Sequence, residues 1–364
     1  MHRRKAVSIT AVLLGVLPFP GCGRAVDQAS AEGGRRPAVA LLLPESKTAR
    51  YETQDRPHFR RRVRELCPAC RLLYANADQD ASVQLSQAEA ALSNGADVLV
   101  LDPVDSAAAS AIVMKAKGAG VPVVSYDRLV LDADVDYHVS FDNERVGELQ
   151  ARALLDRLRE LGRDQVSVVM INGSPTDHNA SQFKRGAHRV LDGSGLRIGA
   201  EYDTPDWSPD RAQQQMEQAV TRLGRGAVAG VYAANDGTAG GAVAAMKAAG
   251  FGELPPVTGQ DAELAAVQRI LAGEQYMTVY KAIAPEAEAA ADLAVALARR
   301  APIRAELINA AVDNGFRRVP SVLLAPVVVR QETVKATVMA DGFWSPAQVC
   351  TGRFVDACRR AGIR

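Results

Sequence analysis

The chain has 364 residues, of which 48% are hydrophobic and 23% are charged, a composition typical of globular proteins and not of disordered ones. A chain of this length suits two domains of common size. Lys and Arg total 43 against 42 Asp and Glu, so the balanced charge excludes the positive field that nucleic-acid binding needs, and we expect no nucleic-acid partner.

The first 21 residues predict an export signal. A basic head, MHRRK, precedes the apolar run AVSITAVLLGVLPF, which has the length of a signal-peptide core and is too short for a stable membrane anchor. Cys22 follows Gly21 in FPGCG, which resembles a bacterial lipoprotein signal, although Phe19 and Pro20 depart from its usual residues. We expect lipid attachment at Cys22; the alternative is plain cleavage near Gly21 with an unmodified Cys22. Residues 22–36 are small and polar and predict a flexible tether.

From residue 37 onward, short apolar runs alternate with helical stretches. The runs are rich in Val, Leu and Ile, as strands covered on both faces are. The predicted strands lie within residues 38–44, 71–77, 96–103, 121–127 and 137–143, and in a second set within residues 165–173, 197–203, 228–236, 255–261 and 276–281. Because helical stretches separate them, the rhythm is that of parallel sheets in two similar α/β domains.

Two helix boundaries have clear sequence signals. Ser106 stands where it would cap a helix over residues 106–120, which Gly118 or Gly120 would end. Ser208 followed by Pro209 opens a second helix, and Gly224 comes just past its end.

Polar residues follow the predicted strands. They are Asp102, Asp127, Arg128, Asp142, Asn143, Asn235, Asp236, Gln260, Asp261 and Lys281. In an open parallel sheet, ligands bind beyond the carboxyl ends of the strands, so these groups should border one cavity or face each other across a cleft. Taken singly, Asp102 and Asp236 also fit a turn and a helix start. The whole set supplies both donors and acceptors, which a polyhydroxylated ligand needs.

Two aromatic residues fit the same kind of ligand. Tyr51 lies in SKTARYE after the first strand, and Trp207 lies in the loop TPDWSPD. Flat rings suit the C–H faces of a sugar. The alternative is a role in the core or the hinge, which fits Trp344 better.

Four cysteines remain besides Cys22, an even number that favours disulfides in an exported chain. Three pairings are open, and sequence proximity favours Cys67 with Cys70 and Cys350 with Cys358. A zinc site or a reactive thiol pair in CPAC fits the spacing and the position after a helix less well. The motifs GxxxxGK[ST], HExxH and GxSxG are absent from the sequence, and we expect no metal and no cofactor.

Several segments together resemble the periplasmic sugar-binding proteins of ABC importers, most closely the D-xylose-binding branch. They are VPVVSYDRLVLDADVDYHVSFDNERVGELQA, GSPTDHNA, AANDGTAGGAV, GQDAELAAVQRI and MTVYK, and the likeness runs from about residue 38 to 343. The resemblance implies the type I binding-protein fold, an α/β fold of two doubly wound parallel-sheet lobes joined by three crossovers. The implied boundaries are residues 37–142 and 282–324 for the N-terminal lobe, 143–281 and 325–349 for the C-terminal lobe, and 350–364 for a tail with a disulfide.

The resemblance also implies which residues hold the ligand. From the N-terminal lobe it implies Arg50, Tyr51, Asp127 and Arg128; from the C-terminal lobe, Asn179, Trp207, Asn235 and Asp261; and from a crossover, Lys281. Two residues depart from the family pattern. Tyr51 stands where we expect Trp, and His178 replaces the middle residue of a DNN run; both should touch the pocket.

We therefore expect a non-enzymatic, monomeric receptor that binds a monosaccharide such as D-xylose and delivers it to an ABC permease by hinge closure. It would be exported, and would lie in the periplasm or, anchored through Cys22, on the outer face of the cytoplasmic membrane. The alternatives are a receptor for chemotaxis or signalling and a sugar-converting enzyme, since paired carboxylates are also available. A sugar-responsive transcription regulator would need a DNA-binding motif before residue 37, where the signal and the tether lie.

Overall fold

The computed structural model describes residues 35–163 and 165–363. The predicted signal peptide, Cys22 and most of the predicted tether lie outside the described residues. Among the helices of the described part, none combines the length and the apolar character needed to span a membrane.

Parallel strands dominate the described part of the chain. The strands are β1 (Ala38–Leu43), β2 (Arg71–Asn76), β3 (Val98–Leu101), β4 (Val123–Tyr126), β5 (Tyr137–Phe141), β6 (Ser167–Asn172), β7 (Arg197–Asp203), β8 (Val228–Ala233), β9 (Met277–Tyr280), β10 (Ala310–Asp313), β11 (Arg318–Leu324) and β12 (Val327–Arg330). Within the described residues they form a larger sheet in the order β10-β11-β5-β4-β3-β1-β2, and two smaller sheets, β7-β6-β8 and β12-β9. Only the pairs β10–β11 and β12–β9 are antiparallel in these sheets of the described chain.

Helices connect the strands. They are α1 (Arg56–Leu66), α2 (Ala81–Ser93), α3 (Ser110–Gly118), α4 (Asn143–Glu160), α5 (His178–Leu191), α6 (Pro209–Leu223), α7 (Asp236–Ala248), α8 (Leu264–Ala272), α9 (Ile283–Ala298), α10 (Pro346–Val349) and α11 (Val355–Arg360). Two short helical turns matter for the site: η1 (Tyr51–Asp55) precedes α1, and η2 (Pro205–Trp207) precedes α6.

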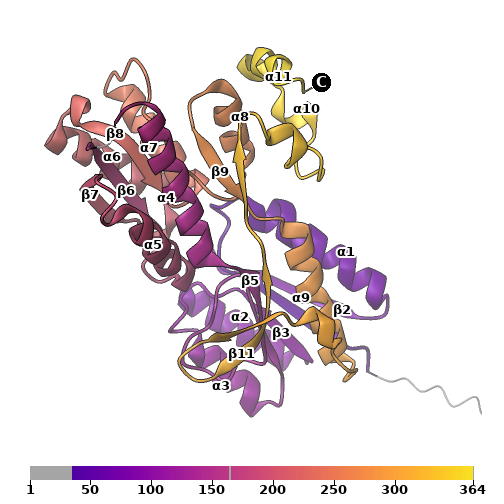
Figure 1. Cartoon of the computed structure of the whole chain (residues 1–364). Coiled ribbons are helices and arrows are strands. Elements are labelled where there is room, and N and C mark those ends of the chain that lie inside the picture. The colour runs from indigo at the N-terminus through magenta and orange to yellow at the C-terminus, as the bar shows by residue number, and fades with distance from the viewer. Residues whose placement is uncertain (1–34, 164, 364) are drawn as a thin grey trace, which may run out of the picture. The chain divides into compact units, whose positions relative to one another are not determined.

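The larger sheet and its helices make the first lobe. Alternate residues of β1 enter two different cores, because side chains of a strand point to opposite faces in turn. Val39, Leu41 and Leu43 pack with α1 and α9, whereas Ala40 and Leu42 pack with α2 and α3. Figure 1 shows α1 beside α9 on one face of this sheet.

The second lobe, built on the smaller sheets, repeats this arrangement. Val168 and Met170 of β6 enter a core with α4 and α5, whereas Val169 and Ile171 enter one with α6 and α7. α4 and α5 pack so closely (Figure 1) that a Cβ at position 147 would lie 1.9 Å from the carbonyl oxygen of Phe183. Only glycine fits at this position. Both lobes therefore bury their sheets on two faces, as the unbroken apolar runs predicted.

The chain passes between the lobes at three places. It leaves the first lobe between β5 and β6, returns between β9 and β10, and leaves again between β11 and β12. The predicted α/β class with two parallel-sheet lobes is confirmed. The exact residue boundaries of the lobes stay a prediction.

Two local predictions were wrong. Residues 255–261 form isolated bridges at Val257 and Gln260 instead of a strand, and the backbone then turns into the left-handed region at Asp261. Ser106 does not cap the helix that follows it: α3 begins at Ser110, and the Ser106 hydroxyl accepts a hydrogen bond from the backbone N–H of His178 at 3.1 Å. Ser106 therefore makes a hydrogen bond between the two lobes.

The cysteine pairing favoured by proximity is present. Cys67 bonds to Cys70 between α1 and β2, and Cys350 bonds to Cys358 at the C-terminal end. The second pair lies in a segment, residues 331–363, that follows β12 and packs against α8 (Figure 1).

Candidate functional site

One cavity gathers polar groups from the strand ends of both lobes. Its volume is about 20 Å³, which is room for about one water molecule. The residues that line it are Thr48, Arg50, Tyr51, Asp127, Arg128, Asp177, Asn179, Phe183, Trp207, Asn235, Gln260, Asp261 and Lys281.

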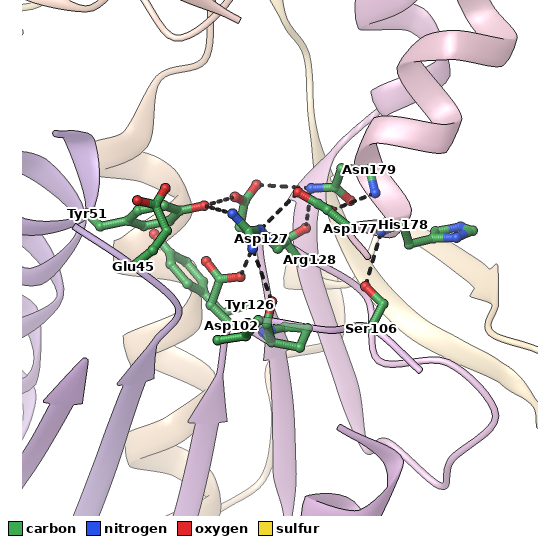
Figure 2. A network of polar contacts seen from close by, with 12 residues as sticks. Glu45, Tyr51, Asp102, Ser106, Tyr126, Asp127, Arg128, Asp177, His178 and Asn179 are labelled. Carbon is green, nitrogen blue, oxygen red and sulfur yellow. Dashed lines mark hydrogen bonds and ion pairs between the residues drawn. The ribbon is translucent and has the colours of Figure 1, made fainter. Parts of the chain in front are cut away.

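Asp127 lies at the centre of the polar contacts, directly after β4. Its backbone is in the left-handed region, with φ of 51°, and its N–H donates to the carbonyl of Val139 at 2.8 Å. This turn aims the carboxylate across the cavity, where Tyr51 and Asn179 both reach it (Figure 2). The carboxylate is therefore shared between donors of the two lobes.

Arg50 supplies positive charge from the first lobe. Its guanidinium donates to Asp55 at 2.7 Å and to Glu286 at 3.1 Å, and lies 3.4 Å from the Asp127 carboxylate. It also lies 3.8 Å from Asp261 of the second lobe. Arg50 is buried, so these carboxylates compensate for its lost hydration.

Lys281 lies beside two of the carboxylates that Arg50 contacts, those of Asp127 and Asp261. Its ammonium nitrogen lies 3.4 Å from Asp127 and 3.7 Å from Asp261, and it is 2% exposed. Burial works to lower the pKa of Lys281, but the nearby carboxylates, Asp127 first, outweigh burial and raise it. Burial works to raise the pKa of Asp127, but Arg50 and Lys281 hold this pKa well below its usual range. Both groups are therefore charged at neutral pH.

Arg128 and Trp207 meet at Asp177, the residue that caps the start of α5. The Arg128 guanidinium lies 3.0 Å from the Asp177 carboxylate, and the Trp207 indole N–H donates to the same oxygen at 3.0 Å. The indole also packs edge-on against Phe183, with ring centroids 6.3 Å apart. Asp177 thus holds a cation and an aromatic wall in place together.

The second lobe contributes amides and a carboxylate near the start of α7 and before α8. Asn235 caps α7 through its side-chain oxygen, which leaves its side-chain nitrogen outside the cap. Gln260 donates to the Asp261 carboxylate at 2.7 Å, while its own side-chain oxygen is buried without a partner among the described residues. The side-chain oxygen of Asn179 is likewise buried and unpaired within the described chain.

The structure brings together all nine side chains that the sequence predicted for the ligand. Whether they hold a ligand stays a prediction. Sequence reasoning missed Thr48, Asp177 and Phe183 as lining residues, whereas Gln260 was among the strand-end residues expected to border the cavity. Asp177 lies within the family segment GSPTDHNA, whereas nothing in the sequence set Phe183 apart from an ordinary core residue.

Two other expectations are refined. His178 does not line the cavity, contrary to prediction, and its ring points away from Asp127 in Figure 2. Neighbouring residues on a helix point about 100° apart, so the helix start that aims Asn179 inward turns His178 away. Asp102 lies behind Arg128, 3.7 Å from the guanidinium, and burial raises the pKa of this carboxyl well above its usual range.

A larger cavity, of about 740 Å³, lies elsewhere. Residues of α4, of the α7–α8 connection and of the end of β12 line it, including Arg157, Tyr276 and Arg330. None of the nine predicted residues is among its lining residues. The small cavity is the better candidate site, because it alone of the two collects buried charged groups from both lobes.

Comparisons with known proteins agree with this arrangement. The periplasmic binding protein domain family matches residues 39–301. The chain is 36% identical over 315 residues to the D-xylose-binding periplasmic protein of Escherichia coli (strain K12), covering 85% of this chain and 92% of that protein. It is 31% identical over 365 residues to the multiple sugar-binding periplasmic receptor ChvE of Rhizobium radiobacter, covering 95% of this chain and 99% of that one.

A solved structure is similar as well. It is an ABC transporter solute binding protein from Clostridium phytofermentans with bound β-D-glucose, with a TM-score of 0.80, 28% identity, and coverage of 86% of this chain and 99% of that one. The two-lobed fold and the cavity between strand ends agree with the family model that matches residues 39–301. The chain therefore belongs to the periplasmic binding protein family.

Proposed function

We propose that this protein binds a monosaccharide, D-xylose or a similar aldopentose, and delivers it to the permease of an ABC importer. Members of its family are binding proteins and not enzymes. The observation that carries the proposal is the meeting of Asp127, Asp261, Arg50 and Lys281, from both lobes, in one buried cavity. Carboxylates accept and cations donate charge-assisted hydrogen bonds, which suits a ligand whose every hydroxyl does both.

The aromatic residues support a sugar over a smaller polar ligand. Trp207 and Phe183 border the same cavity as the charged groups. They offer apolar surface for the C–H faces of a pyranose ring. The proposed ligand residues are therefore Arg50, Tyr51, Asp127, Arg128, Asn179, Trp207, Asn235, Asp261 and Lys281.

Hinge closure is part of the proposal. A cavity of about 20 Å³ is too small for a monosaccharide, so the lobes must separate before a sugar enters. Bonds from the sugar to both lobes would then favour the closed form, which the permease would recognise. We also propose that the protein acts as a monomer.

The proposed location is outside the cytoplasm. After export, lipid attachment at Cys22 would hold the protein on the outer face of the cytoplasmic membrane. A Cys22→Ser variant should then move from the membrane fraction to the soluble fraction. Equal membrane association of both forms would reject the lipid anchor.

A signalling role is the second candidate, favoured by the similarity to a protein named as a receptor. Uptake of labelled sugar by cells that lack this protein separates the two roles. Lost uptake supports import, and normal uptake with a lost response to the sugar supports signalling.

The binding proposal is tested by thermal unfolding with D-xylose, L-arabinose, D-ribose, D-glucose and D-galactose. At 100 times its dissociation constant, a ligand stabilises the folded protein by about 2.7 kcal/mol. We expect the largest shift with D-xylose. No shift with any of the five sugars would refute the proposal.

A further inference from the structure

The segment of residues 331–363 packs against α8 and β9, close to Asp261 and Lys281, and contributes no residue to the lining of the cavity. Its apolar residues share a core with α8 and β9, and Phe343 and Trp344 are buried in that core. Further contacts fasten it to α8 and to the turn after it: Gln268 of α8 donates to the carbonyl of Val349 at 3.0 Å, and Arg353 pairs with Glu274 at 2.7 Å. The segment is therefore part of the folded second lobe.

Two adjacent residues of this segment contact three stretches of the chain that lie next to predicted ligand residues. The Trp344 indole N–H donates to the carbonyl of Ala262 at 2.7 Å, next to Asp261. The Phe343 carbonyl accepts a hydrogen bond from Gln54 at 3.3 Å, in the turn that follows Arg50. The Phe343 ring packs edge-on against Tyr280, with centroids 5.1 Å apart, next to Lys281.

The turn beside Trp344 has an unfavourable backbone. Asp261 has φ of 100° and Ala262 has φ of 51°, both in the left-handed region that non-glycine residues rarely adopt. Such a conformation persists only where surrounding contacts fix it. Two contacts come from β9: the Asp261 N–H donates to Val279, and the Ala262 N–H donates to the Thr278 hydroxyl. The third is the Trp344 hydrogen bond.

This turn decides where the Asp261 carboxylate lies. In the observed conformation the carboxylate is 3.7 Å from the Lys281 ammonium and 3.8 Å from the Arg50 guanidinium. If Ala262 relaxed to the right-handed region, the direction of the preceding peptide would change and the carboxylate would leave these cations. The position of Asp261 is thus linked to a contact made outside the cavity.

We propose that Trp344 is a positioning residue for the sugar site, which holds the Asp261–Ala262 turn in its binding conformation through the indole N–H. This inference rests on the proposed function, because it names what Trp344 does for that site. Trp344 does not line the cavity, so it acts through Asp261 and not on the ligand itself.

The variant Trp344→Phe tests the proposal, since it keeps an aromatic ring beside Phe343 and removes the donor. One net hydrogen bond predicts about five- to tenfold weaker affinity for D-xylose by calorimetry. The melting temperature of the sugar-free protein should fall by a few degrees, because the buried Ala262 carbonyl loses its donor. Arg353→Ala is the matched control, because it loosens the same segment far from the turn, and its affinity should equal that of the wild type.

A double variant separates positioning from a general structural role. If Trp344 acts through Asp261, adding Trp344→Phe to Asp261→Asn weakens binding little further than Asp261→Asn alone. Losses of affinity that simply multiply would overturn the proposal, as would an affinity of Trp344→Phe equal to that of the wild type.

Hydrogen exchange gives a readout that needs no sugar. The backbone amides of Asp261 and Ala262 should exchange faster in Trp344→Phe than in the wild type, and at the wild-type rate in Arg353→Ala. Unchanged exchange in Trp344→Phe overturns the positioning role. If none of the five sugars binds the wild type, the proposed function fails, and the exchange result still decides whether Trp344 holds the turn.

The wild-type protein provides a further test should Trp344→Phe not fold. The sequence has only two tryptophans, so their indole N–H signals are readily distinguished by magnetic resonance. Linkage is reciprocal: if the Trp344 bond favours sugar binding, bound sugar must favour the bond. The indole N–H of Trp344 should then exchange more slowly with saturating D-xylose, and an unchanged rate would contradict the inference.

Discussion

Replacing Lys281 with methionine should destabilise the protein strongly even in the absence of any sugar. Methionine has a similar length and no charge, so the substitution removes the ammonium and leaves most of the packing. Asp127 and Asp261 would then lose a cation that lies 3.4 Å and 3.7 Å away. The remaining cation near both carboxylates is Arg50, which Asp55 and Glu286 already engage.

The magnitude follows from the distances. At an effective dielectric constant of about 20, unit charges separated by the 3.4 Å between Lys281 and Asp127 attract by about 5 kcal/mol. Repulsion from Arg50 and the dehydration of the ammonium offset part of this attraction. Removal of one partner from a buried ion pair costs about 3–5 kcal/mol. We therefore expect the free energy of unfolding at pH 7 to fall by this amount.

The loss should depend on pH in a defined way. The folded-state pKa of Asp127 is lowered, so its ionic contribution is fully present above the unfolded pKa of about 3.9 and disappears as the pH falls through the folded value. The pKa of Lys281 is raised, so its contribution is fully present below about 10.4 and is lost as the pH rises further. The difference between wild type and variant should thus be constant from about pH 5 to 9 and shrink below pH 4.

Urea unfolding followed by circular dichroism measures this difference, with the denaturant slope compared between the two proteins. Lys115→Met is the matched control, since Lys115 pairs with Glu89 at 2.8 Å but both side chains are 48% exposed. The control should change stability by less than about 1 kcal/mol. A Lys281→Met protein as stable as the wild type would refute the reasoning about the buried charges.

Three further predictions concern other parts of the molecule. Burial lowers the pKa of His138 to about 4, so the folded protein holds this side chain neutral, and its contribution to stability is fully present above about pH 6.5. The free energy of unfolding should therefore fall by about 3 kcal/mol as the pH drops from 6.5 to 4. In His138→Gln the free energy of unfolding, measured in urea, should change less over this range, and an equal change in both proteins would contradict the prediction. A Cβ on Gly173 would lie 2.0 Å from the Trp207 ring, so Gly173→Ala should displace that ring and weaken sugar binding at least about tenfold by calorimetry. If the variant binds the sugar with wild-type affinity, Trp207 is not a ligand residue. Replacing Cys350 and Cys358 with serine opens a loop of sequence separation 8 and should lower the free energy of unfolding in urea by about 2.5 kcal/mol. The same change at Cys67 and Cys70, whose separation is 3, should lower it by about 1.6 kcal/mol, and the reverse order would be inconsistent with loop entropy as the cause.

Much of the fold was predictable because parallel strands buried on two faces leave an unbroken apolar signature. β1 and β6 are buried along their whole length, and both were recognised as strands. Residues 255–261, PPVTGQD, lack this signature: they have one Val among Pro, Gly and polar residues, and they form only isolated bridges before the chain turns at Asp261. Local composition does not reveal such a turn.

The candidate site was predictable where polar residues interrupt the apolar pattern at strand ends. Asp127, Asp261 and Lys281 stand out in this way, and the structure places both carboxylates within 4 Å of the Lys281 ammonium. Phe183 did not stand out, because an aromatic residue on an amphipathic helix looks like any core residue. Trp344 contacts Ala262 from 82 positions away, and such a contact cannot be read from local sequence.

The most direct test of the account is a calorimetric titration of D-xylose into the wild type and into Asp261→Ala. We expect saturable binding of one sugar per chain to the wild type. The variant should bind about 30-fold more weakly, or by roughly 2 kcal/mol, because donors in the closed site would lose their charged partner. Equal affinity of the two proteins, or no binding of any of the five sugars to the wild type, would contradict a sugar held between Asp127 and Asp261.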